Sequence, residues 1–315
     1  MKAININFLD FSADFDKYNN DFVRILSKYF VVNISDKPDY LFCSCFGVKH
    51  LKYNCIKIFY TGENIKPNLD IYDYAIGFDE IENSRRYLRW PLYKLFQYRK
   101  DLKLALSSNN PYKNVKKDGF CSFVVSNSYA MKERKVIFDK LNEYKKVSSG
   151  GKYLNNIGGP VDNKIEFQSR HKFVIAFENS SAPGYTTEKI VQAFASRSIP
   201  IYYGNPNIGN EFNEKAFINC HNYQNLDEVV EKVKLVDNND QIFNEMINEP
   251  ITDIDLLDEK PLESFLLNIF DRNYTEVKCI IIDRGYKKNV HRIKCQYRKK
   301  RFLLAIRKLK KVFNR

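Results

Sequence analysis

The sequence predicts an α/β protein built of two successive units, each with a mostly parallel sheet covered by helices. Short β-rich runs alternate with amphipathic helical runs along most of the chain. The length of 315 residues suits two domains of ~100 to 200 residues, each with its own core. A polar stretch at residues 98–118, with an Asn-Asn-Pro turn signal, interrupts the alternation, so we expect the domain boundary there.

The predicted elements form two series, one on each side of this stretch. In the first, β-branched and aromatic runs predict strands and one amphipathic run predicts a helix: AININF, DYLFCSCF, CIKIFY and YDYAIGF as strands, and NDFVRILSKYF as the helix. The second series repeats the alternation: CSFVVSN, KFVIAFEN, IPIYYG and AFINC as strands, and AMKERKVIFDKLNEY, TTEKIVQAFASR and NLDEVVEKVKLV as helices. Strands that alternate with helices in this way favour parallel pairing in both units.

Positive charge is concentrated at the C-terminus. The chain has 51 Lys and Arg against 38 Asp and Glu, a formal charge of +13. Residues 286–315 hold thirteen basic side chains and no acid, so residues 1–285 are neutral. A nucleic-acid enzyme is expected to carry a basic surface on its folded body. We therefore expect no nucleic-acid partner.

The basic tail also has a helical repeat of apolar residues. Phe302, Ile306, Leu309 and Phe313 recur at steps of three and four, with cations between them. This pattern is typical of an amphipathic helix on an anionic membrane surface. A solvated basic helix and a segment that docks on a partner protein remain alternatives.

Other features of composition bear on location. No apolar run approaches the ~20 residues of a membrane span, and the N-terminal residues lack a secretory signal. The seven cysteines are odd in number and irregularly spaced, which argues against a disulfide framework. We expect a cytoplasmic protein that is peripheral to the membrane.

Polar residues gather directly after three predicted strands. These loops are residues 61–64, Ser126 with Asn127, and residues 178–189. Open α/β sheets bind ligands at the carboxyl ends of their strands, so these loops are the candidate ligand sites.

The third loop has the features of an anion site. Gly184 permits a tight turn, and Thr186 or Thr187 can cap the helix that follows. The helix N-terminus and Lys189 would attract a diphosphate, and Tyr185 could contact a base or a sugar. A capping motif with an exposed charge pair is the alternative.

The same region resembles a known family. Residues 173–206, FVIAFENSSAPGYTTEKIVQAFASRSIPIYYGNP, are similar to the donor-site signature of the bacterial α-1,3/α-1,4-fucosyltransferases, the family 10 glycosyltransferases. Four other segments resemble that family in the same order: FYTGEN, YDYAIGFDEIENSRRYLRWPLY, FCSFVVSNS and GGKYLNNIGG. The resemblance covers most of residues 55–220.

The resemblance implies an architecture and a reaction. The fold would be GT-B, with two Rossmann-like domains that face each other across a cleft: residues 1–110 for the acceptor, 111–270 for GDP-L-fucose, and 271–315 as the basic amphipathic tail. The enzyme would transfer L-fucose with inversion to O3 or O4 of GlcNAc in N-acetyllactosamine-type glycans, giving a Lewis-antigen-like product. As a bacterial enzyme it would act on glycan precursors such as those of lipopolysaccharide, at the inner face of the inner membrane.

The resemblance also implies roles for single residues. Glu63, in Tyr-Thr-Gly-Glu, matches the family's catalytic base, a carboxylate that accepts the proton of the acceptor hydroxyl. The implied donor-binding residues are Ser126, Asn127, Glu178, Asn179, Tyr185, Glu188 and Lys189. The family's Arg against the diphosphate falls on Leu154 here, so Lys152 is its expected substitute, although a Lys cannot form the bidentate contact of an Arg.

No cofactor or metal is expected. Residues 14–16 and 253–255 both read Asp-x-Asp, but each lies in a predicted loop or linker, and the four histidines lack ligand spacing. Two other functions remain open: a GT-B transferase for another nucleotide sugar, and an inactive relative that serves as a basic interaction protein. Trp90 either lines the acceptor cleft or packs at the hinge.

Overall fold

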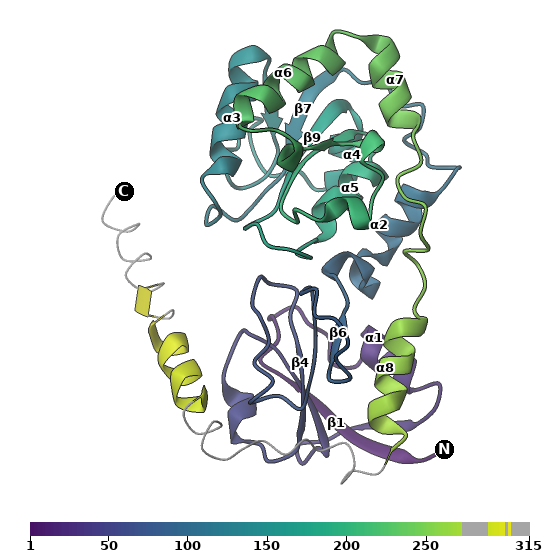
Figure 1. Cartoon of the computed structure of the whole chain (residues 1–315), viewed down its shortest axis with the longest axis vertical. Helices are drawn as coiled ribbons and strands as arrows, with labels where there is room; N and C mark the ends of the chain where they lie inside the picture. The colour runs from purple at the N-terminus through teal and green to yellow at the C-terminus, as the bar shows by residue number, and fades with distance from the viewer. Residues whose placement is uncertain (273–288, 300–301, 304–315) are drawn as a thin grey trace. The chain divides into compact units, whose positions relative to one another are not determined.

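The structure is a computed structural model of the chain and describes residues 1–272, 289–299 and 302–303 (Figure 1). The chain divides into two compact units. Unit 1 comprises Met1–Gly77, Ile81–Trp90 and Glu259–Arg315, and unit 2 comprises Phe78–Glu80 and Pro91–Asp258. Each unit contains one sheet, as the alternating pattern predicts.

Unit 1 is built on a six-stranded parallel sheet of order β2-β1-β3-β4-β5-β6. The strands are β1 (Ala3–Leu9), β2 (Val31–Ile34), β3 (Tyr40–Cys43), β4 (Ile56–Tyr60), β5 (Tyr74–Gly77) and β6 (Tyr87–Arg89). Every residue of β3, β4 and β5 is buried, which explains why their sequences are continuous apolar runs. The helices in the described part of this unit are α1 (Asp21–Leu26), the 3-10 turn η1 (Lys49–Lys52), α8 (Lys260–Phe270) and residues 289–299.

Helices α1 and α8 are brought together although they are far apart in sequence. The Asn20 side chain caps α1 by accepting a hydrogen bond from the Val23 N–H. At the end of α8, the Phe270 ring packs 4.4 Å from the Tyr40 ring, measured between centroids. Because α8 buries one apolar face in unit 1, the chain returns to this unit after completing unit 2.

Unit 2 is built on a five-stranded parallel sheet of order β11-β10-β9-β7-β8. The strands are β7 (Gly119–Phe123), β8 (Val147–Ser149), β9 (His171–Phe177), β10 (Ile199–Tyr203) and β11 (Ile218–Asn219). The helices are α2 (Phe96–Leu106), α3 (Glu133–Tyr144), α4 (Lys164–Ser169), α5 (Glu188–Ala195), α6 (Leu226–Asp237) and α7 (Asp240–Asn248). Short 3-10 turns are η2 (Leu92–Lys94), η3 (Ile208–Asn210), η4 (Glu214–Ala216) and η5 (Cys220–Asn222).

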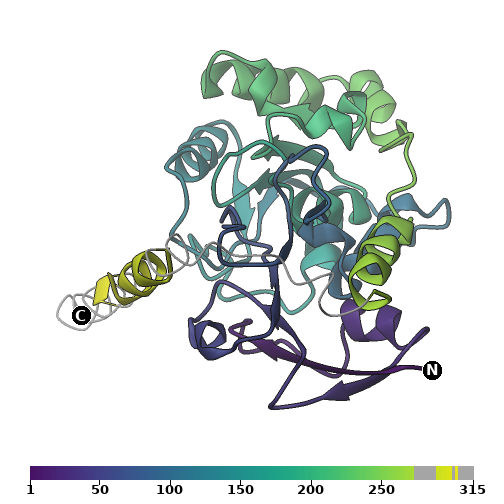
Figure 2. The same cartoon turned by 60° about the horizontal axis from the view of Figure 1, so that its bottom comes forward.

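Strand β9 shows how helices cover both faces of this sheet (Figure 1 and Figure 2). Phe173, Ile175 and Phe177 point to one face and pack in the core formed with α3, α6 and α7. The alternate residues Val174 and Ala176 pack in a second core with α2 and α5. Unit 2 is therefore a three-layer α/β/α sandwich, with the loops after its strands at one edge.

The compact units differ from the predicted domain bounds of 1–110, 111–270 and 271–315. The expected polar linker at 98–118 contains much of α2, whose Leu102 and Ala105 are buried against α5 in unit 2. The division therefore falls after Trp90 and again after Asp258. Trp90 itself is buried, and its backbone N–H donates to the Gly77 carbonyl.

Two expectations concern the chain as a whole. Within the described residues, no helix is both long and apolar enough to cross a bilayer. The cysteines in this part of the chain are free thiols: Cys43, Cys45, Cys55, Cys121, Cys220 and Cys295. Cys279 lies outside the described residues.

Candidate functional site

A buried carboxylate occupies the N-terminal end of α5. Glu178 follows β9 and is completely buried. Its two oxygens accept hydrogen bonds from the Thr187 N–H at 2.7 Å, the Thr187 hydroxyl at 2.6 Å and the Lys189 ammonium at 2.8 Å. Gly204 leaves room for this side chain, because a Cβ there would lie 2.4 Å from the Glu178 Cγ. The helix N-terminus is thus already matched by an internal anion.

The predicted capping of α5 by a threonine hydroxyl is wrong. Thr187 occupies the N-cap position, but its hydroxyl accepts no hydrogen bond from a backbone N–H of the helix and accepts one from the Lys189 ammonium at 2.9 Å. Its hydroxyl instead donates to Glu178, and the Thr186 hydroxyl donates to Glu211 at 2.7 Å. Buried carboxylates compete successfully for these hydroxyls because a hydrogen bond to an ionised acceptor is the stronger one.

Lys189 is held in an ion-pair cluster. Its ammonium lies 2.8 Å from the Glu178 carboxylate and 3.5 Å from that of Glu188, and only 14% of its side chain is exposed. Burial opposes the charge, but the two carboxylates raise the pKa of Lys189 above its usual range. Burial likewise opposes the charge of Glu188, yet Lys189 and Lys164 hold the pKa of Glu188 below its usual range. Lys189 is therefore a fixed cation at the start of α5.

A second buried network fixes the turn before α5. Gly184 has a φ of 77°, which a residue with a side chain rarely adopts, and its N–H donates to Asn205 at 2.7 Å. The Asn205 amide also donates to Glu211 at 3.0 Å. The second Glu211 oxygen accepts from the Tyr93 hydroxyl at 2.6 Å. The turn is consequently held by Asn205 from the segment after β10, Glu211 from the end of η3 and Tyr93 from η2.

Tyr185, which follows Gly184 in this turn, is buried. Its side chain is 2% exposed, and its ring meets that of Phe78 edge to face, with centroids 4.9 Å apart. Both residues belong to unit 2. Within this unit the Tyr185 ring therefore contributes to packing.

Arg134 joins two of the predicted donor loops. It is 1% exposed and lies at the start of α3. Its guanidinium donates to the Phe177 carbonyl at 2.8 Å and to Asn179 Oδ1 at 2.9 Å, and it reaches the Asn127 carbonyl at 3.4 Å. Ser126 and Asn127 are exposed in the loop after β7. Arg134 thus ties the loop after β7 to the loop after β9.

The glycine-containing loop after β8 approaches the end of β7. A Cβ on Gly151 would lie 2.1 Å from the Val125 carbonyl oxygen, so only glycine allows this close backbone contact. The next residue, Lys152, is exposed. Leu154, where the family's Arg was expected, has a φ of 54°, an uncommon conformation for a residue with a branched side chain.

Glu63 lies in unit 1, directly after β4. Its backbone is fixed by Thr61, which is buried and accepts a hydrogen bond from the Glu63 N–H at 3.0 Å. Its own side chain is exposed. A buried anchor with an exposed carboxylate suits a group that must meet an incoming substrate.

Among the described residues, no three His, Cys, Asp or Glu side chains are grouped so that they could hold a metal ion. The acids of both Asp-x-Asp sequences are exposed: Asp14, Asp16, Asp253 and Asp255.

Comparison with known proteins places this geometry in a family. Residues 6–96 match the model of the alpha-(1,3)-fucosyltransferase FucT N-terminal domain, and residues 114–248 match that of the glycosyltransferase family 10 (fucosyltransferase) C-terminal part. A crystal structure of an alpha1,3-fucosyltransferase with GDP-fucose is 30% identical, with a TM-score of 0.73, over 87% of this chain and 92% of that one. The chain belongs to glycosyltransferase family 10, the fucosyltransferases. Another crystal structure of an alpha1,3-fucosyltransferase gives a TM-score of 0.75 at 31% identity, over 89% of this chain and 93% of that one.

Curated relatives in family 10 are longer than this chain. The alpha-(1,3)-fucosyltransferase FucT of Helicobacter pylori is 36% identical over 269 residues, which are 73% of this chain and 56% of the relative. A putative fucosyltransferase of Acanthamoeba polyphaga mimivirus is 28% identical over 73% of this chain and 39% of its own length. The chain thus spans about half the length of these relatives. The predicted family and the predicted α/β fold of GT-B type are confirmed.

Sequence reasoning about this family 10 site missed its buried supports. Arg134, Asn205 and Glu211 hold the loops that carry the motif residues, and none belongs to a predicted site. The buried position of Arg134 could have been predicted from the sequence. Arg134, Ile137 and Leu141 are spaced at helical steps of three and four, which places this cation on the apolar face of the helix. No local sequence pattern indicates the roles of Asn205 and Glu211, because their partners are distant in sequence.

Proposed function

We propose that this family 10 chain transfers L-fucose from GDP-L-fucose to O3, or O4, of GlcNAc in N-acetyllactosamine-type glycans, with inversion and a Lewis-antigen-like product. The observation that carries the proposal is the fixed Lys189 cation at the start of α5, inside the donor motif. The names of similar proteins support it: one crystal structure is described with GDP-fucose, and the Helicobacter pylori relative is an alpha-(1,3)-fucosyltransferase.

In this proposal unit 2 binds the donor. Lys189 stabilises the negative charge that develops on the departing GDP, and Glu178 fixes its ammonium. Glu188 contacts hydroxyls of the nucleotide sugar. Lys152, exposed after Gly151, supplies a second positive charge toward the diphosphate in place of the family's Arg. The other proposed donor contacts are Ser126, Asn127, Asn179 and Tyr185.

Glu63 is the proposed general base. Its carboxylate accepts the proton of the acceptor hydroxyl as that oxygen attacks the anomeric carbon of fucose. The new C–O bond forms while the bond to the diphosphate breaks, and a single displacement of this kind inverts the anomeric centre. No step needs a bound metal, because Lys189 and Lys152 offset the charge of the leaving group.

Transfer from GDP-L-fucose to N-acetyllactosamine and to its β-1,3 isomer, with a chelator present, tests the proposal. We expect Glu63→Gln to lower kcat by about 10² to 10⁴, the usual contribution of a general base. Glu82→Gln, at an exposed acid of the same unit, is the control and should change little. The preferred isomer identifies O3 or O4.

Other outcomes of this assay would support the alternatives. Binding of another nucleotide sugar in preference to GDP-L-fucose would indicate a different donor. Activity that is unaffected by Glu63→Gln would remove this residue as base, and absence of all transfer and donor binding would indicate an inactive relative.

We further propose that the tail binds the anionic surface of the bacterial inner membrane from the cytoplasm. Residues 289–299 are helical, and Phe302 is 67% exposed. Lys294, Arg298 and Lys299, called the outward cations here, are exposed on this helix. Ile306, Leu309 and Phe313 of the predicted apolar stripe lie outside the described residues, as do the cations before 289 and after 303. Polybasic helices of this kind are attracted to anionic lipids.

A further inference from the structure

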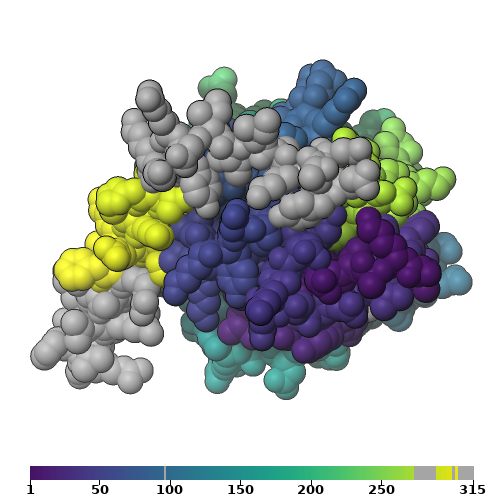
Figure 3. Space-filling view, turned by 90° about the horizontal axis from the view of Figure 1, so that it is seen from below, coloured from purple at the N-terminus to yellow at the C-terminus, as the bar shows by residue number. Residues whose placement is uncertain are grey.

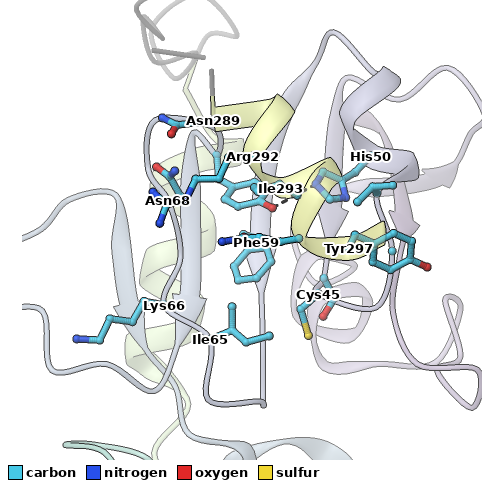
Figure 4. A pocket seen from close by; sticks show the side chains of 15 residues that line it. Cys45, His50, Phe59, Ile65, Lys66, Asn68, Asn289, Arg292, Ile293 and Tyr297 are labelled. Atoms are coloured by element: carbon cyan, nitrogen blue, oxygen red, sulfur yellow. Dashed lines mark hydrogen bonds between the residues drawn. The ribbon is translucent and has the colours of Figure 1, made fainter. Parts of the chain in front are cut away.

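A cavity of about 450 Å³ lies in unit 1, with the helix 289–299 as one wall (Figure 4). The opposite walls come from residues that follow β3 and from β4 and the loop after it. The side chains that give it chemical character are aromatic, amide or cationic: Phe59, Tyr72, Tyr297, Asn68, Asn289, Gln296, Lys66 and Arg292.

One face of the helix 289–299 is directed at this cavity. Five residues of this helix line the cavity: Asn289, Arg292, Ile293, Gln296 and Tyr297. The last four lie three, four, seven and eight positions after Asn289, which places all five on one face of a helix. Of the outward cations, Lys294 and Arg298 lie on the other face, and Lys299, seven residues after Arg292, lies at the edge of the lining face. Figure 3 shows the helix (yellow) beside the indigo part of unit 1. The helix thus has two different surfaces, and only one of them is strongly basic.

Three contacts hold the helix on unit 1. The Asn289 amide donates to Asp70 at 3.1 Å, and the Tyr297 hydroxyl donates to the Phe46 carbonyl at 3.4 Å. Ile293 packs against the apolar cluster that contains Phe59 and Tyr72. The cavity is therefore completed by the tail.

The cavity and Glu63 share a loop. Ile65, Lys66 and Asn68 line the cavity, and Glu63 precedes them in the segment that follows β4. Parallel strands β3 and β4 end at the same edge of the sheet, where open α/β sheets bind ligands. Under the proposed function the donor residues are in unit 2, which leaves the acceptor as the ligand for a cavity in unit 1.

The chemistry of the walls indicates what part of an acceptor fits. Aromatic faces pack against the CH groups of sugar rings, and amides hydrogen-bond to hydroxyls. No carboxylate lines the cavity within the described residues. The nearby acids already have partners: Asp10 bonds His50 Nδ1 at 2.7 Å, and Asp70 accepts from Asn289.

Arg292 supplies the decisive charge. In Figure 4 it lies beside Asn68 and Asn289 at one end of the cavity, whereas Lys66 extends away from them. We propose that this cavity binds a negatively charged group of the acceptor saccharide, a sugar carboxylate or a phosphate, and that Arg292 selects it. The inference rests on the proposed function and adds the acceptor class and a specificity residue from the tail.

An adjoining cavity gives room for more than one sugar. It has a volume of about 590 Å³ and lies along the end of β1, with Phe11, Phe15 and Lys17 in its walls. Gly47, Val48 and Tyr297 line both cavities. An acceptor chain can therefore extend from one cavity into the other past Tyr297.

Transfer from GDP-L-fucose to three acceptors tests the inference: neutral N-acetyllactosamine, its 3′-sialyl derivative, which carries a carboxylate, and N-acetyllactosamine 1-phosphate. We expect the wild type to prefer one anionic acceptor, and its identity distinguishes carboxylate from phosphate. Arg292→Gln should raise KM for that acceptor about tenfold, as for a lost hydrogen bond to a charged group, and leave KM for the neutral acceptor unchanged. Arg298→Gln, an outward cation of the same helix, is the matched control and should change neither.

Two results would overturn the inference. One is transfer to all three acceptors with the same KM in wild type and Arg292→Gln. The other is an equal rise of KM for neutral and anionic acceptors, which would indicate a structural role. Absence of transfer to every acceptor would contradict the proposed function instead. Calorimetric titration with the two anionic saccharides then tests the cavity independently of transfer. Equal affinity of wild type and Arg292→Gln, or no binding to either protein, would exclude the cavity as an anion-binding site.

Discussion

Replacing Arg134 by Met is expected to separate the two donor loops that this buried side chain joins. The substitution removes the donors to the Phe177 carbonyl at 2.8 Å and to Asn179 at 2.9 Å. A buried acceptor left without its donor costs about 1 to 3 kcal/mol, which applies to the Phe177 carbonyl. The Asn179 side chain is half-buried, so its lost hydrogen bond costs about 0.5 to 1.5 kcal/mol. Removing a buried guanidinium charge offsets part of this sum. We expect the free energy of unfolding to fall by about 1 to 3 kcal/mol.

The functional consequence is separable from stability. Arg134 also reaches the Asn127 carbonyl, so its loss frees the loop after β7 from the loop after β9. We expect GDP to bind about tenfold more weakly to Arg134→Met, a change of about 1.4 kcal/mol. Urea unfolding measures the stability, and calorimetric titration with GDP measures the affinity under conditions in which the variant is folded.

The neighbouring residue provides a control. Lys135 is exposed on the same helix and pairs with Asp139 one turn away. A surface ion pair of this kind contributes little to stability, and Lys135→Met should leave GDP affinity unchanged. Wild-type affinity for GDP in folded Arg134→Met would refute the positioning role of Arg134, whatever its stability.

Two further predictions concern the Glu178–Lys189 ion-pair cluster and the tail. Gly204→Ala places a Cβ 2.4 Å from the Glu178 Cγ, so we expect a loss of about 1 to 3 kcal/mol in unfolding free energy and weaker GDP binding. Gly159→Ala, where a Cβ meets nothing within 4 Å, is its control, and equal effects of the two would contradict the packing argument. Replacing all three outward cations by Gln should weaken binding to phosphatidylserine vesicles in low salt about a hundredfold, at about 1 kcal/mol per charge. Unchanged co-sedimentation with those vesicles would exclude this surface as the membrane contact.

The strands of both sheets were predictable because they are buried on two faces. Strands β4 and β9 read as continuous apolar runs for this reason. Helix α2 was not predicted, since most of its residues are polar and only Asp101, Leu102 and Ala105 are buried among its described side chains. Likewise the membership of α8 in unit 1 depends on contacts with α1, which no local pattern encodes.

In the candidate site, too, local motifs were predictable and long-range contacts were not. Motif similarity identified Lys189 and Glu178 but not how they are paired, because the pairing depends on the path of β9 and α5. Glu211 was missed because its partner Tyr93 is 118 residues away in sequence. The role of the tail as a cavity wall was also missed, since its contact with Asp70 spans 219 residues. Long-range partners of this kind are fixed by tertiary packing alone.

The return of the chain to unit 1 has a consequence for engineering acceptor preference. Exchanging residues 1–90 between family members would leave behind α8, whose Phe270 packs against Tyr40 and whose preceding Glu259 pairs with Arg24. Such a chimaera would combine a sheet from one parent with a covering helix from another. A transplant that also carries residues 259–272 and the helix 289–299 moves the sheet, its covering helix and the proposed acceptor cavity together.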